Sequence, residues 1–84
     1  MQASKSIHFR KFAPIDREHP IFELVDGDTV LLAIGATDDG VFEIAVHEGA
    51  ANRVFTFAEF LRFIEQGRQL AEDDLKQATS GTGP

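Results

Sequence analysis

The chain has 84 residues, with 14 acidic and 8 basic side chains, a net charge of −6 and no cysteine. This length suits one domain with one core, and the lack of cysteine excludes disulfides, thiolate nucleophiles, iron–sulfur clusters and cysteine-based zinc sites. No apolar run reaches the length of a signal-peptide core or a membrane span. We therefore expect a soluble, cytoplasmic protein of bacterial or phage type, with no membrane partner.

The charge is distributed unevenly along the chain. Residues 1–19 hold four basic and two acidic side chains, a net +2, whereas residues 20–84 hold four basic and twelve acidic ones, a net −8. An acidic body repels a phosphate backbone, so nucleic acid is an unlikely partner. The basic N-terminal arm leaves a small nucleic-acid accessory protein as an alternative.

The first half of the chain predicts strands. Residues 5–12 alternate loosely and carry basic side chains, as edge strands do, and residues 13–20 form a charged connection between two prolines. Apolar runs at 20–25 and 29–35 then flank Asp26-Gly27. This dipeptide is typical of two-residue hairpin turns, because both central positions need a positive φ.

A further strand is predicted at 41–47, after the polar loop at 36–40. If Leu32 lies opposite Ile44, six apolar side chains share one face of the sheet. These are Val30, Leu32, Ile34, Phe42, Ile44 and Val46. A short strand at 53–55 is the candidate for a fifth member of the sheet.

The stretch "FTFAEF" marks the start of a helix. Thr56 and Glu59 have the spacing of a capping box, in which each side chain accepts a hydrogen bond from the backbone of the other residue. Phe55 and Phe60 then occupy the two positions of a hydrophobic staple. The change in phenylalanine spacing from two to three therefore follows the change from strand to helix.

The helix is predicted over 57–76, with Phe57, Phe60, Leu61 and Ile64 along the face that packs on the sheet. Gly67 either ends the helix in a left-handed cap or lies inside it at a cost in stability of about 1 kcal/mol relative to alanine. Ala71 and Leu75 continue the apolar stripe, which favours one long helix. Residues 78–84 are predicted to be a disordered tail.

These elements predict a single domain over residues 1–77. It has two layers and belongs to the α+β class: an antiparallel meander sheet of four to five strands, with one C-terminal helix packed on one face.

Catalytic and cofactor motifs are absent. The chain has no nucleophile elbow, no phosphate-binding loop and no dinucleotide fingerprint. His47 with Glu43 and Glu48 is the one histidine–carboxylate cluster, and residues four apart on a strand lie ~13 Å apart, too far to share a metal ion. We therefore expect no enzyme activity, no cofactor and no metal, and we keep a metal-binding or enzymatic role of His47 as the weakest alternative.

The sheet face away from the helix is the predicted binding surface. A two-residue turn at Asp26-Gly27 places Phe22 opposite Leu31 on that face, whereas a turn one residue longer places Ile21 and Val25 there. The N-terminal strand is a candidate to fold over part of this face. The predicted partner-binding residues are Phe22, Leu24, Leu31, Ala33, Glu43, Ala45 and His47.

Such a face predicts a small acidic, non-catalytic protein-binding module, whose partner is another protein or a second copy in a homodimer. A small acidic sheet with one packed helix resembles the architecture of bacterial immunity proteins and phage-type inhibitors. That resemblance implies an inhibitor or immunity-type protein that acts by docking.

Overall fold

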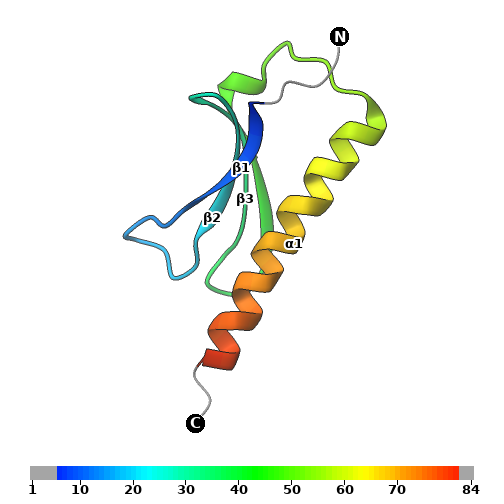
Figure 1. Cartoon of the computed structure of the whole chain (residues 1–84). Coiled ribbons are helices and arrows are strands. Elements are labelled where there is room, and N and C mark those ends of the chain that lie inside the picture. Colours follow the sequence, from blue (N-terminus) through cyan, green and yellow to red (C-terminus); the bar gives the residue numbers. More distant parts are fainter. Residues whose placement is uncertain (1–5, 82–84) are drawn as a thin grey trace.

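The computed structural model describes residues 6–81. Four strands form one antiparallel sheet in the order β1-β2-β3-β4, and a long helix, α1, covers one face (Figure 1). The bounds of these elements are β1 Ile7–Phe12, β2 Ile21–Asp26, β3 Thr29–Ala36, β4 Phe42–Val46, the short 3-10 helix η1 Glu48–Ala50, and α1 Phe57–Gly81. The predicted α+β meander is confirmed with four strands. The fifth strand at 53–55 is wrong, since these residues lie in the irregular connection from η1 to α1.

The β2–β3 hairpin differs from the prediction in its turn and its register. Asp26 pairs with Thr29, so the two central residues are Gly27 and Asp28, and Gly27 has a φ of 62°. Further along, Leu24 pairs with Leu32 whereas Val25 pairs with Val30. One extra residue on β3, Leu31, is therefore accommodated as a β-bulge. The bulge changes which side chains of β2 and β3 lie opposite one another.

The β3–β4 hairpin is shifted by two residues from the predicted register. Leu32 pairs with Val46 and Ile34 pairs with Ile44, instead of Leu32 with Ile44. The turn is set by Gly40, whose φ of 85° only glycine adopts readily and whose amide donates to the Thr37 carbonyl at 2.9 Å. Because side chains alternate with a period of two, this shift leaves the apolar residues of β4 on the face that the sequence predicts.

Helix α1 approaches the sheet closely at Gly67. A Cβ at this position would lie 2.3 Å from Cδ1 of Ile34 and 3.1 Å from Cζ of Phe9, so a larger residue would displace these side chains. Gly67 is therefore a contact point and not the end of the helix. The prediction of one long helix is confirmed, and α1 continues into the first four residues of the predicted tail, while 82–84 lie outside the described residues.

The start of α1 follows the capping signals in the sequence. The Glu59 amide donates to the Thr56 hydroxyl at 3.1 Å, and the Phe55 ring lies 5.7 Å from that of Phe60 and 6.1 Å from that of Phe63. The staple is confirmed. The connection after η1 arches across to α1, whose first turns stand away from the strands (Figure 1), and Phe55 at its end packs against the helix.

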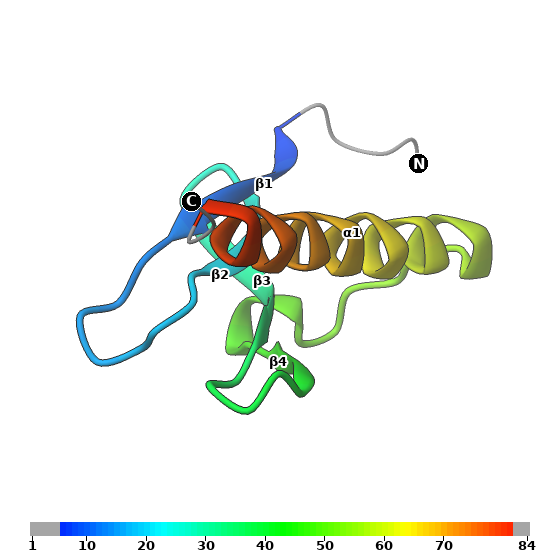
Figure 2. The ribbon, with the colours of Figure 1, turned by 90° about the horizontal axis from the view of Figure 1, so that it is seen from below.

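The helix covers only part of the sheet. It packs on β2 and β3 and reaches β1 through Phe9, while β4 lies to one side of it (Figure 2). Leu24, Leu31 and Leu32 form the centre of the core. The predicted helical stripe is wrong in two of its four members, since the side chains of Phe57 and Leu61 are 81% and 50% exposed. The close approach at Gly67 turns a different face, which includes Phe60, Phe63 and Ala71, toward the strands.

Candidate functional site

The sheet face opposite α1, called the helix-free face below, carries small and polar side chains over β3 and β4. The strand registers place two rows of residues across it. One row is Arg10, Glu23, Ala33 and Ala45, and the next is Phe12, Ile21, Gly35 and Glu43.

Four of the seven predicted binding residues lie on this face and line one open pocket of about 140 Å³. These four are Ala33, Glu43, Ala45 and His47, and the pocket is completed by Arg17, Ile21 and Gly35. The structure thus brings together residues from β2, β3, β4 and the connection between β1 and β2. The sequence contained no signal that Arg17 would join them.

The other three predicted residues are buried in the core. Phe22 is 7% exposed, and Leu24 and Leu31 are fully buried. Their assignment to the outer face is wrong because the bulge at Leu31 shifts the register between β2 and β3 by one residue, which exchanges the two faces. Phe22 consequently pairs with Ile34, which touches α1, and Ile21 takes the outward position, as the alternative register predicted.

The connection at 13–20, and not the N-terminal strand, is held beside this face. Arg17 donates from Nη2 to the carbonyl of Ala36 at 2.8 Å, and the Glu18 amide donates to the Asp38 carboxylate at 3.2 Å. Strand β1 is a regular member of the sheet, and its Ile7 and Phe9 pack on the core side. The idea that the N-terminal strand folds over the helix-free face is therefore wrong.

The pocket has an apolar floor and a charged rim. Ala33, Gly35 and Ala45 are small, so the floor leaves room above it, whereas Arg17, Glu43 and His47 supply ionisable groups around it. Among the described residues, no group of three histidine or acidic side chains is placed to hold a metal ion.

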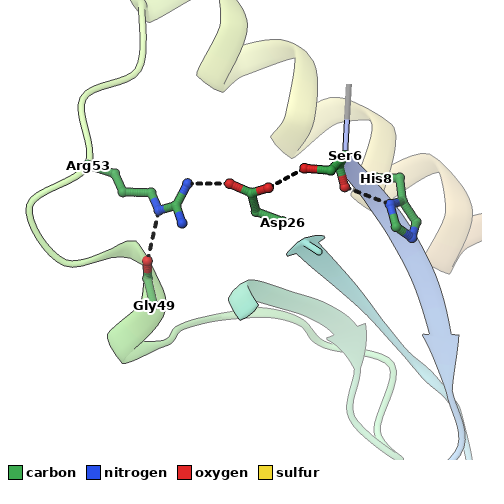
Figure 3. Close-up of polar contacts among 5 residues, drawn as sticks. All are labelled: Ser6, His8, Asp26, Gly49 and Arg53. Atoms are coloured by element: carbon green, nitrogen blue, oxygen red, sulfur yellow. Dashed lines mark hydrogen bonds and ion pairs between the residues drawn. The ribbon is translucent and has the colours of Figure 1, made fainter. Parts of the chain in front are cut away.

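A second polar cluster, which the sequence analysis missed, surrounds Asp26 (Figure 3). Its carboxylate accepts from Nη1 of Arg53 at 2.7 Å and from the Ser6 hydroxyl. Arg53 also donates from Nε to the Gly49 carbonyl at 3.0 Å, and Nδ1 of His8 lies 2.9 Å from the Ser6 carbonyl oxygen. The local sequence marks Asp26 only as a turn residue, and its partners 20 and 27 residues away leave no local pattern.

The cluster around Asp26 resembles a catalytic triad in composition only. Ser6 donates its proton to a carboxylate, and His8 contacts a backbone oxygen, so the imidazole is not placed to take the serine proton. The contacts instead join the beginning of β1, the β2–β3 turn and the segment after η1. We assign them a structural role.

The cations of the N-terminal arm are engaged within the molecule. Arg10 contacts the carboxylate of Glu23 at 2.9 Å, and Lys11 contacts that of Asp74 in α1 at 3.2 Å. Glu23 is buried, and only 12% of its side chain is exposed, so its charge requires this partner. Lys5 lies outside the described residues.

Comparison with protein-family models, with curated proteins and with solved structures found no match to this chain. Within the described residues, no helix is both long enough and apolar enough to cross a membrane.

Proposed function

We propose that this chain is a small, non-catalytic protein-binding module that docks on a partner protein through its helix-free face. The observation that carries the proposal is the open pocket of about 140 Å³, with its floor of small residues and its rim of Arg17, Glu43 and His47. Pockets with a few polar groups on an apolar base are common places for recognition.

The charge of the molecule supports a partner with a basic surface. Residues 20–84 carry a net −8, and complementary potentials raise the rate of association and select among partners. An inhibitor or immunity-type protein, which blocks its target by covering a functional surface, is the most specific form of this proposal.

The nucleic-acid alternative has less support. Arg10 and Lys11 are paired with carboxylates, and Arg17 donates to a backbone carbonyl. An electrophoretic shift assay at ~50 mM salt, where phosphate contacts are strongest, is expected to show no shift at micromolar protein. A shift that collapses as salt rises would favour this alternative over protein binding.

The proposal is tested by affinity capture from cells of the source organism, using the wild type, Ala45→Arg and Ala58→Arg. Ala45 lies on the pocket floor, whereas Ala58 is an exposed residue on α1, so the two variants add the same bulk and charge at different faces. We expect a partner that the wild type and Ala58→Arg retain and that Ala45→Arg loses. Equal retention by all three proteins would contradict a docking role for the pocket.

A further inference from the structure

Strand β4 is exposed over its whole length on the side of the sheet that α1 covers elsewhere. Phe42, Ile44 and Val46 point to the helix side, and their exposed fractions are 39%, 50% and 73%. Within residues 6–81, no strand pairs with the outer edge of β4. Edge strands of soluble monomers are usually protected by charge, proline or a cover, because an open apolar edge pairs with other chains.

The backbone of β4 offers its free hydrogen-bonding groups at these same three residues. The Thr37 amide donates to the Val41 carbonyl, and the His47 amide donates to the Leu31 carbonyl. Residues 41 and 47 thus face β3, and so do 43 and 45, because the direction alternates along an antiparallel strand. The N–H and C=O groups of Phe42, Ile44 and Val46 therefore point to the open edge.

The sequence of β4 is complementary to itself when two copies run antiparallel. With the two-fold axis at Ile44, that residue meets its own copy, and Phe42 meets Val46. Both pairs join residues whose backbone groups point outward, as hydrogen-bonded pairs require. Glu43, the one charged residue of the strand, meets Ala45 and does not meet a second Glu43.

The position of α1 explains why its own chain leaves β4 uncovered. A helix is about 10 Å wide and neighbouring strands are about 4.8 Å apart, so one helix covers roughly two to three strands. Asp74 contacts β1, which places the helix on that side of the sheet. Phe57 and Leu61 of α1 are also exposed, so the helix itself adds exposed apolar surface.

We propose that a second copy of this chain pairs its β4 antiparallel to β4 of the first, with the two-fold axis at Ile44. The product is a continuous eight-stranded sheet with both α1 helices on one face. The apolar side chains of the two β4 strands lie between these helices. An interface of this kind is isologous, the commonest type in soluble oligomers, and it lies beside the pocket on the helix-free face, which Glu43 and Ala45 also line.

The mass in solution is the first test. Light scattering after gel filtration at ~100 μM, a concentration suited to an interface of modest size, is expected to give twice the chain mass of 9.3 kDa. Ile44→Lys places two like charges opposite each other and should give the monomer mass. Ile15→Lys removes an apolar side chain that is fully exposed outside the sheet, so this control should remain dimeric. A wild type of 9.3 kDa, or a dimeric Ile44→Lys, would overturn the proposal.

The register is tested by disulfide formation, since the chain has no cysteine of its own. Ile44→Cys should cross-link to itself, because paired residues lie about 5.5 Å apart between Cα atoms and a disulfide spans about 4.4–6.8 Å. Val46→Cys alone should not cross-link, because two copies of residue 46 lie ~13 Å apart along the strands. A mixture of Val46→Cys and Phe42→Cys should cross-link. Equal cross-linking of the two single variants, or none by Ile44→Cys, would overturn the register and the proposed pairing.

Discussion

The two edges of the sheet, β1 and β4, are built from similar numbers of residues and differ in how they meet the rest of the molecule. On β1, Ile7 and Phe9 pack into the core, while Arg10 and Lys11 form ion pairs with Glu23 and Asp74. On β4, all five residues are exposed, and the single charge, Glu43, points to the helix-free face. Strand β1 is therefore half-buried at Ile7 and Phe9 and carries two ion-paired cations, whereas every residue of β4 is exposed.

This difference follows from where the helix crosses the sheet. Gly67 lets α1 approach Ile34 and Phe9, which draws the helix over β1, β2 and β3 and away from β4 (Figure 2). Two strands can therefore share the same apolar pattern and the same face and still differ in burial. Burial is decided by where the helix lies on the sheet.

The largest expected effect compares two isoleucines that are direct neighbours across β3 and β4. Ile34 is 2% exposed and Ile44 is 50% exposed, and they pair in the sheet. Ile34→Ala is expected to lower the free energy of unfolding by about 2–5 kcal/mol, because it leaves a cavity under α1. Ile44→Ala should cost about 1 kcal/mol, since half of its side chain is already in water.

Urea unfolding of both variants, at protein concentrations low enough for the monomer, measures the two free energies. Equal losses for Ile34→Ala and Ile44→Ala would mean that β4 is covered in the monomer and that the contrast between the two edges is false.

The second prediction concerns the ion pair of Arg10 and Glu23, which joins β1 to β2. Arg10→Ala leaves the carboxylate of Glu23, which is mostly buried, without the guanidinium that contacts it. We expect a loss of about 1–3 kcal/mol, the usual cost of an unsatisfied buried polar group, and partial recovery in the double variant Arg10→Ala, Glu23→Gln. Arg62→Ala, at an exposed position of α1, is the matched control and should stay within about 0.5 kcal/mol of the wild type. If Arg10→Ala lowers the free energy of unfolding no more than Arg62→Ala does, the Arg10–Glu23 pair does not stabilise the β1 edge.

Much of this fold was predictable because its signals are local. Thr56 and Glu59 mark the helix start within four residues, Gly40 sets a turn, and alternation in β4 predicts its apolar face. What the sequence did not predict was the register between neighbouring strands. The bulge at Leu31 is one residue, yet it moved three predicted surface residues into the core, because each step of one residue exchanges the two faces of a strand.

The candidate site was also predictable only where its residues belong to regular strands. Ala33, Glu43, Ala45 and His47 belong to the regular β3–β4 hairpin, whose faces follow from alternation. Arg17 reaches the pocket from a connection, and its position depends on a hydrogen bond to Ala36 that no local pattern encodes. The charge distribution was also predictable only in part. The sequence shows that the N-terminal arm is basic, but its acidic partners, Glu23 and Asp74, are known only from the structure.

The third prediction concerns the end of α1 that stands away from the sheet. Thr56→Ala removes the hydroxyl that accepts from the Glu59 amide and should destabilise the protein by about 1 kcal/mol. Thr56→Ser keeps a hydroxyl and serves as the control. The loss should leave the disulfide pattern of the β4 variants unchanged, because the cap holds the first turn of the helix and not the edge strand. Urea midpoints measure the stability, and a serine variant as unstable as the alanine variant would show that the cap is not responsible.

The smallest expected effect belongs to the ion pair of Glu65 and Arg68 on α1. A hydrogen bond from the Arg68 guanidinium, together with its charge, holds the pKa of the Glu65 carboxyl below its ordinary value of 4.5. A carboxyl whose pKa is lower in the folded state stabilises the protein above its unfolded pKa, and this contribution is lost as the pH falls through the folded value. The side chains of Glu65 and Arg68 are 65% and 42% exposed, so the effect is small and is screened by salt. The stability advantage of the wild type over Glu65→Gln should therefore be present at pH 7 and disappear below the pKa of Glu65 in the folded protein.

In Arg10→Ala, by contrast, the loss at pH 7 should be several times larger, because the carboxylate on the β1 side is shielded from water. An advantage over Glu65→Gln that stays constant as the pH falls through the folded pKa of Glu65 would mean that the pair acts through packing and not through its charge.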